Sequence, residues 1–191
     1  MKKNFTTAVL YTIVTTVLLG LIYPLVITGA ARVLFREKAD GQLISRNGAT
    51  IGSRIIAQPF TGEAYFHPRP SAAGNGYDAT NSGGSNLGPT NQKLVDRVKA
   101  DVASLQAENP GKPIPVDLVT TSGSGLDPDI TPAGAEFQIP RVAKARGIPE
   151  ADLRRLVAEH TQDRQLGILG EARVNVLELN LALDEKYTAK N

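Results

Sequence analysis

The sequence predicts a single N-terminal transmembrane helix followed by one mixed α/β (or α+β) domain. Residues 4–31 run for 28 positions without a charged side chain, and a helix needs about 20 apolar residues to cross a bilayer core. The remaining residues alternate short β-branched runs, apolar patterns at helical spacing and breaks rich in Gly and Pro. We therefore place the anchor and its basic flanks at residues 1–38 and the domain at residues 39–191.

The apolar segment has two other interpretations, a buried core helix and a cleaved signal peptide. Globular helices rarely continue so far without a charge, and a signal sequence usually has roughly 7–15 apolar residues. Thr28-Gly29-Ala30 has the small residues of a cleavage site. Basic residues flank both ends of the segment, so charge alone does not decide its orientation.

One face of this helix carries small residues four positions apart, namely Ala8, Thr12, Thr16 and Gly20. Small residues at this spacing allow a second helix to approach closely, although the Thr hydroxyls are equally suited to bonding their own helix. Pro24 cannot donate to the carbonyl of Gly20, which predicts a kink there. A carbonyl freed in this way favours burial against a partner over exposure to lipid.

The first part of the domain predicts a hairpin and a long helix. Residues 42–51 have strand character on both sides of Asn47-Gly48, a strong hairpin turn, and residues 53–57 are expected to extend the sheet. A helix is expected to start at Thr90 as N-cap and to end at residues 109–111. Its predicted buried face comprises Leu94, Val95, Val98, Val102 and Leu105, and its predicted exposed face comprises Lys93, Asp96, Arg97, Lys99 and Asp101.

The second part predicts a strand at 116–121 and three or four helices. Pro132 suits a first helical position, and Pro140 is expected to begin a separate helix that stops at Gly147. Residues 149–162 form the next helical pattern. Residues 174–184 are ambiguous because their leucines alternate as in a strand; we favour a helix because Asn175 and Glu178 resemble a capping box. The buried face of the 149–162 helix is expected to comprise Leu153, Leu156 and Val157.

Composition excludes several functions. The chain contains no Cys, so disulfides, thiolate metal sites and Cys nucleophiles are absent. Although the pI is near 8.9, the basic excess flanks the anchor: beyond Lys38 there are 16 Lys or Arg and 18 Asp or Glu, a net charge of −2. A slightly acidic domain of mixed charge is a poor binder of phosphate backbones, so we predict no nucleic-acid partner.

Few residues carry the patterns of catalytic or ligand sites. No GxxxxGK[ST] or GxSxG motif occurs, and two His, His67 and His160, are too few for a metal site. The run of Ser82, Gly83, Gly84, Ser85 and Asn86 loosely resembles the signature loop of ABC transporters. Because no strand-loop-helix frame surrounds it, this likeness is weak, and we favour a tight, hydrogen-bonded loop packed on the domain. Arg69 lies between two prolines and is presented for a fixed ion pair, either within the domain or with a partner subunit.

Residues 65–91, YFHPRPSAAGNGYDATNSGGSNLGPTN, closely resemble a signature of the KdpC family, the C subunit of the bacterial Kdp potassium pump. Further matches occur, in order, along the chain: Gly125-Leu126-Asp127, Asp129-Ile130-Thr131-Pro132, QIPRVAKAR at 138–146 and VNVLELNLALD at 174–184. The resemblance covers nearly the whole chain.

The resemblance implies a non-catalytic subunit of a P-type ATPase. Its implied partners are a potassium-channel-like subunit, an ATP-hydrolysing subunit, a small membrane subunit and the lipid bilayer. It implies a single pass through the bacterial cytoplasmic (inner) membrane, with the N-terminus cytoplasmic and the domain extracytoplasmic. No cofactor belongs to this chain; ATP and Mg bind the pump subunit, and potassium is the transported ion.

The family also implies roles in complex assembly, in shaping the outer potassium entrance and in raising ATP affinity. The Ser82–Asn86 loop is implied as a contact surface, and Gln165, Gly167 and Gly170 are implied in the nucleotide effect. Relatives often carry Pro where this chain has Ala172. Because ATP is hydrolysed in the cytoplasm, an outer domain must act on it through the membrane.

Asp127 and Asp129 are expected at most to enrich cations near an entrance. The rival hypothesis is an independent membrane-anchored extracytoplasmic enzyme or binding module. It requires a convergent nucleophile, base and orienting group, or a recognisable ligand cleft. The sequence supplies no such set.

Overall fold

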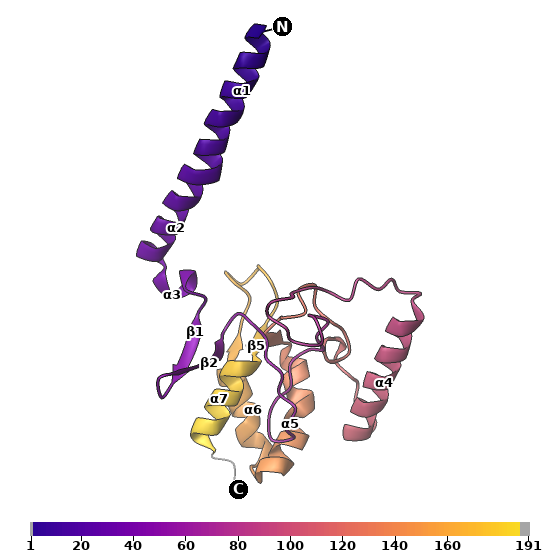
Figure 1. Ribbon diagram of the computed structural model, residues 1–191. Coiled ribbons are helices and arrows are strands. Elements are labelled where there is room, and N and C mark those ends of the chain that lie inside the picture. The colour runs from indigo at the N-terminus through magenta and orange to yellow at the C-terminus, as the bar shows by residue number, and fades with distance from the viewer. Residues whose placement is uncertain (1, 188–191) are drawn as a thin grey trace. The chain divides into compact units, whose positions relative to one another are not determined.

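The computed structural model describes residues 2–187, which divide into two compact units between Ile51 and Gly52. The first unit is built from the helical segments α1 (Lys2–Val17), η1 (Leu18–Ile22), α2 (Tyr23–Leu34) and α3 (Arg36–Ala39) and the strand β1 (Leu43–Arg46). Strand β2 (Ala49–Ser53) connects the units in sequence. Figure 1 labels α1, α2, α3, β1 and β2.

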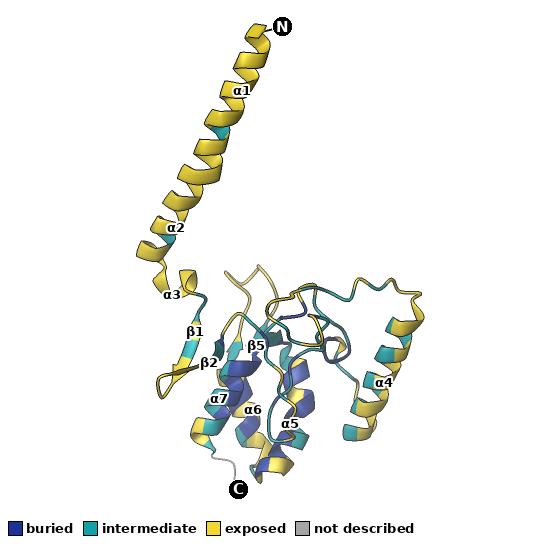
Figure 2. Cartoon of the chain, viewed as in Figure 1, coloured by how far each residue is buried: buried dark blue, intermediate teal, exposed yellow. Residues whose placement is uncertain are grey.

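The apolar N-terminal segment forms one continuous run of helix from Lys2 to Leu34, 33 residues long. By length and composition it is suited to cross a membrane, and within the described residues no other helix is. None of its apolar window is buried, and Figure 2 shows it exposed along most of its length. The interpretation as a buried core helix is therefore wrong.

The structure accommodates Pro24 by a local change of helix type. Residues Leu18–Ile22 wind as a π-helix, and the N–H of Tyr23 bonds the carbonyl of Leu18, five residues earlier. Proline has no backbone N–H to donate, and a π-turn of this kind is a common way for a helix to accommodate that missing hydrogen bond. This π-helical turn directly precedes Pro24, and the kink expected there stays a prediction.

The predicted hairpin is confirmed. β1 and β2 pair across Asn47 and Gly48, which have φ values of 52° and 79°, the two positive values of a type I′ turn. The expected extension of the sheet to residue 57 is wrong. Beyond β2 there is only an isolated bridge between Ser53 and Ile56, because the chain turns back on itself there.

The second unit contains a small antiparallel sheet with strand order β3-β5-β4. Its strands are β3 (Asp129–Ile130), β4 (Thr161–Gln162) and β5 (Arg173–Asn175). Both outer strands pair with β5, so that Val174 lies opposite Ile130 on one side and Thr161 on the other. The helices of this unit are α4 (Gln92–Glu108), the 3-10 turn η2 (Val116–Leu118), α5 (Pro132–Arg146), α6 (Glu150–Glu159) and α7 (Val176–Lys186).

Helices α5, α6 and α7 pack against one another and, with the sheet, enclose the hydrophobic core (Figures 1 and 2). Phe66 joins this core from the Gly- and Pro-rich segment and is fully buried. The predicted burial of Leu153, Leu156 and Val157 on α6 is confirmed. Other core residues are Ile130, Ile139, Val142, Val174, Val176, Leu179 and Leu183.

The strand predicted at residues 116–121 is wrong. The chain forms η2 there, and the carboxylate of Asp117 accepts hydrogen bonds from the backbone N–H of Thr131 at 2.7 Å and from its hydroxyl at 3.1 Å. This carboxylate supports the start of α5, where the Thr131 hydroxyl in turn caps the N–H of Gly134 at 2.9 Å. A long-range polar contact therefore overrides the β-branched composition.

The separate helix predicted at Pro140 is also wrong, because α5 continues through it from Pro132 to Arg146. Burial of Phe137, Ile139 and Val142 on both sides of Pro140 offsets the hydrogen bond that proline removes. The predicted stop is confirmed: Gly147 is left-handed, with φ 66°.

Two smaller corrections concern α4 and α7. Asn91 rather than Thr90 caps α4, and the apolar face of α4 is only half-buried. Arg97 and Asp101 are also half-buried and pair at 2.8 Å instead of facing solvent freely. For α7 the favoured helix is confirmed, with Asn175 as its cap and the short β5 just before it.

Candidate functional site

The segment of residues 62–67 lacks regular secondary structure but is held by side chains of α5 and α7. The side-chain amide of Asn180 accepts from the N–H of Phe66 and donates to its carbonyl, both at 2.9 Å. Gln138 does the same for His67, at 2.7 and 3.0 Å. Each amide side chain thus satisfies both backbone groups of one residue, as a neighbouring strand would.

Two arginines of α5 complete this network. Arg141 donates to the carbonyls of Glu63 (2.7 Å) and Tyr65 (2.9 Å) and forms an ion pair with Glu108 at 3.0 Å. Arg146, whose side chain is only 1% exposed, donates to the carbonyl of Ala64 at 2.7 Å.

Arg146 also binds the C-terminal part of the domain. Its guanidinium pairs with Asp184 at 2.7 Å, donates to the carbonyl of Tyr187 at 2.8 Å and lies 4.7 Å from the centre of the Tyr65 ring. A buried guanidinium is stable only when its donors are satisfied in this way. The YFHPRP, QIPRVAKAR and LNLALD segments, which carry much of the family resemblance, therefore meet in one structural network.

The Ser82–Asn86 loop packs closely on residues 122–125. The N–H of Gly83 and the hydroxyl of Ser82 donate to the carbonyl of Ser124, at 2.8 and 3.0 Å. A Cβ on Gly84 would lie 3.1 Å from the carbonyl of Gly123. This geometry supports the interpretation as a tight packed loop.

Arg69 forms an internal ion pair with Asp127 at 2.9 Å. Its backbone carbonyl accepts from the hydroxyl of Tyr77 at 2.7 Å, and burial raises the pKa of Tyr77 to about 12. The ion pair within the domain, one of the two alternatives predicted for Arg69, is therefore present. A partner contact for Arg69 stays a prediction.

The two aspartates expected near a cation entrance are both engaged internally. Asp127 pairs with Arg69, and Asp129 pairs with Arg173 at 3.0 Å and accepts from Asn175 at 3.2 Å. Burial, and then the nearby charge of Asp127, raise the pKa of Asp129. These contacts weaken the case for cation enrichment by this pair.

Residues 165–169 form an isolated, solvent-exposed hairpin, which contains Gln165 and Gly167 of the predicted nucleotide-effect motif. Gln165 and Leu169 exchange both backbone hydrogen bonds, each at 2.9 Å. Leu166 and Gly167 make the turn with left-handed φ values of 55° and 75°. Gly170 follows, also left-handed.

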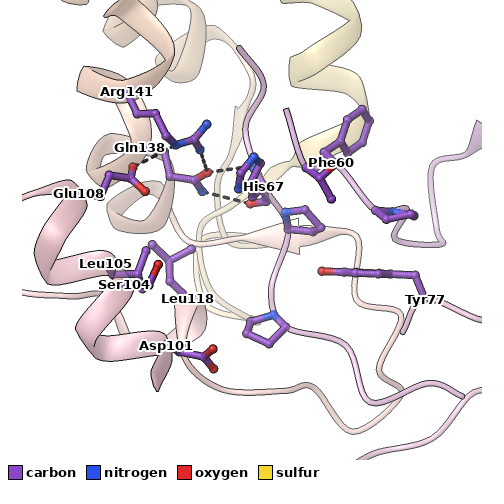
Figure 3. A pocket seen from close by; sticks show the side chains of 14 residues that line it. Phe60, His67, Tyr77, Asp101, Ser104, Leu105, Glu108, Leu118, Gln138 and Arg141 are labelled. Carbon is purple, nitrogen blue, oxygen red and sulfur yellow. Dashed lines mark hydrogen bonds and ion pairs between the residues drawn. The ribbon is translucent and has the colours of Figure 1, made fainter. Parts of the chain in front are cut away.

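A pocket of about 270 Å³ beside the 62–67 segment brings together His67, Ser104, Asp101 and Glu108, the residue types of a hydrolase (Figure 3). Their contacts do not form a triad. The Nε2 atom of His67 lies 3.0 Å from the carbonyl of Gly62. Figure 3 shows Glu108 joined to the network that runs through Arg141 and Gln138 to His67.

The electrostatics of this pocket disfavour the protonated form of His67. Its pKa is lowered, first by burial and then by the charge of Arg141, while Asp101 is paired with Arg97. Over residues 2–187 no cluster of three or more His, Cys, Asp or Glu suited to a metal occurs. The residues of this pocket are therefore not arranged as a hydrolytic active site.

The predicted site residues fall into separate groups. Ala8, Thr12, Thr16, Gly20 and Pro24 lie on the N-terminal helix; the described hydroxyl bonds to the helix backbone come from Thr6, Thr7 and Thr15. In the domain, the Ser82–Asn86 loop, Arg69 and the 165–169 hairpin make different contacts. The sequence reasoning missed Gln138, Arg141, Arg146 and Asn180, although Asn180, placed among core leucines, is a detectable signal of a buried polar role.

Comparison with known proteins confirms the family that the sequence resembles. Residues 5–185 match the family model described as KdpC: K+-transporting ATPase, c chain. A potassium-transporting ATPase KdpC subunit of Koribacter versatilis is 73% identical over 184 residues, covering 96% of this chain and 95% of that protein. The subunit of the same name from Acidobacterium capsulatum is 59% identical over 185 residues, covering 97% of this chain and all of that protein.

A third relative is the KdpC subunit of Methylobacterium nodulans, which is 60% identical over 182 residues and covers 89% of this chain and 90% of that protein. The family-model match at residues 5–185 takes in most of the N-terminal helix, the whole 62–67 network and most of α7. The chain therefore belongs to the KdpC family, the c chain of K+-transporting ATPases.

Proposed function

We propose that this chain is the non-catalytic subunit of a high-affinity, ATP-driven potassium uptake pump and is required for its assembly. The proposal of a non-catalytic role is supported by the contacts in the pocket. The three side chains there that are best suited to acid–base chemistry each make a structural contact, namely His67, Asp101 and Glu108. The exposed helix Lys2–Leu34 supports the membrane part.

In this proposal the helix anchors the chain in the bacterial cytoplasmic membrane, with the N-terminus cytoplasmic and the domain outside. Its partners are a potassium-channel-like subunit, an ATP-hydrolysing P-type subunit and a small membrane subunit. Potassium selectivity belongs to a partner, because one helix cannot surround a dehydrated ion with oxygen ligands.

The effect on ATP affinity is proposed to be indirect. The 165–169 hairpin presents aliphatic side chains, and the neighbouring Arg164 is paired with Glu171. Such a surface is poorly suited to a triphosphate, which favours cationic groups or a helix N-terminus. Coupling must then act by stabilising one state of the complex over another.

The function is tested by deleting this chain in its host and measuring both growth at micromolar potassium and recovery of the intact ATPase. We expect loss of both, with restoration by the full chain from a plasmid. Normal growth with an intact, active ATPase would overturn the proposal.

The small-residue face is tested by the double change Thr16→Leu with Gly20→Leu. Bulky side chains there should prevent close helix approach and reduce co-purification of the other subunits. Leu18→Ile in the same helix is the matched control. Unchanged co-purification of the double variant would remove this face from the interface.

The nucleotide effect is tested by Gln165→Ala in the intact complex. We expect a rise of several-fold in the ATP concentration that gives half-maximal ATPase activity, the range of a coupling free energy of about 1 kcal/mol. An unchanged ATP dependence would show that the family role does not transfer to Gln165.

A further inference from the structure

The 165–169 hairpin concentrates exposed hydrophobic surface at one point of the domain. Leu166 is 87% exposed, Ile168 76% and Leu169 55%; we call these three side chains the apolar tip. In the described part of the second unit, the other large hydrophobic residues with exposed side chains are Ile55 and Val116. Single exposed residues are ordinary, but a group of three within four positions is not.

Four of the five backbone N–H groups of residues 165–169 donate to carbonyls of the same short segment. The N–H groups of Gln165 and Leu169 bond each other's carbonyls, and those of Gly167 and Ile168 donate to Arg164 (3.1 Å) and Gln165 (3.2 Å). These donors therefore need no water when the tip enters a dry environment. A pre-ordered hairpin also loses little conformational entropy on binding.

The charge pattern favours a protein surface over a lipid surface. Arg164 and Glu171 form an ion pair at the base of the hairpin, and the tip itself is aliphatic, without Lys, Trp, Tyr or Phe between Gln165 and Gly170. Segments that bind membrane surfaces usually combine unpaired cations with aromatic residues. A neutral aliphatic knob instead matches an apolar pocket in a subunit interface.

We propose that the apolar tip inserts into an apolar pocket on another subunit of the K+-transporting ATPase. This inference rests on the proposed function and assigns a contact to the region that contains Gln165. Any influence of Gln165 on ATP affinity is then a consequence of docking: the side chains beside it bind a partner, and the partner transmits the effect.

The first test compares full-length chains co-expressed with the other subunits. The variant Leu166→Ser with Ile168→Ser should lower retention in the detergent-extracted complex at least tenfold, as expected for truncation of central interface side chains. Val116→Ser removes a comparably exposed residue elsewhere in the domain and should leave retention unchanged. Leu166→Met with Ile168→Leu, which keeps the apolar surface and places no β-branched residue at the left-handed position 166, should retain the wild-type level.

The second test places a photocrosslinking amino acid at position 166 of the intact complex in native membranes. An adduct with another subunit supports the proposal. An adduct with lipid alone assigns the tip to the bilayer and overturns the proposal, as does the absence of any adduct together with wild-type retention of the Ser variant. If the unmodified chain itself fails to co-purify, the proposed function fails instead, which separates the two conclusions.

Discussion

The 62–67 segment and the 165–169 hairpin are both irregular, but they are ordered in opposite ways. Side chains from two helices hold the first and bury Phe66 at its centre. The second is held by its own backbone bonds and directs large aliphatic side chains into solvent.

The difference separates a structural segment from a binding segment. A segment whose polar groups are satisfied by distant side chains belongs to the core and supports folding. A segment that is rigid by itself but leaves apolar surface uncovered is better suited to a partner. The 62–67 segment therefore has a structural role, and the hairpin is the stronger candidate for contact.

The largest effect is expected from Arg146→Ala. This change leaves Asp184 and two backbone carbonyls without their buried donor and should lower the free energy of unfolding by about 3–5 kcal/mol. Urea denaturation of the full chain in detergent measures it. Arg154→Ala is the control, because that side chain pairs with Glu136 at the surface, and its loss should change the free energy of unfolding far less. Equal effects of the two changes would remove the distinction drawn for the 62–67 segment.

A smaller loss is expected from Asn180→Leu. Leucine fits the apolar surroundings but leaves the N–H and carbonyl of Phe66 unpaired, which should cost about 2–4 kcal/mol. The same denaturation experiment applies, with the exposed Asn81→Leu as control. A neutral or stabilising result would mean that Phe66 finds other partners.

In the hairpin, Gly167→Ala should cost about 1 kcal/mol, because alanine disfavours the left-handed φ of 75° while the space around it is open. Gly88→Ala, with open space and no positive φ, is the control. The loss should be local, visible as faster amide exchange at residues 165–169 without a change in α5 or α7. Faster exchange throughout the domain would show that the hairpin is part of the core.

The smallest effect concerns pH. The pKa of His67 is lowered in the folded domain, so the unfolded chain binds more protons once the pH falls towards the ordinary value of about 6.5. Stability should therefore decline as the pH drops through that value and level off below the folded pKa. His67→Gln should flatten this part of the curve. An identical slope in the variant would assign the dependence to other groups.

Features determined by neighbours in sequence were predictable. The charge-free helix, the Asn47-Gly48 turn, the stop at Gly147 and the cap of α7 at Asn175 each depend on residues within a few positions. The motifs that resemble the KdpC family likewise led to the family that the comparisons show.

Only the tertiary structure decided the contacts between distant residues. His67 and Gln138 are 71 positions apart, and Phe66 and Asn180 are 114 apart. The errors at residues 116–121 and at Pro140 have the same kind of cause, because contacts with residues outside the local segment decide the structure there. The hydrogen bond of Asp117 to Thr131 and the burial around Pro140 outweigh local propensity. The sequence by itself determined the charge-free N-terminal helix, the Asn47-Gly48 turn, the cap of α7 at Asn175 and the family. The folded domain alone decided which polar side chains support the backbone and which apolar ones remain exposed, because both depend on burial.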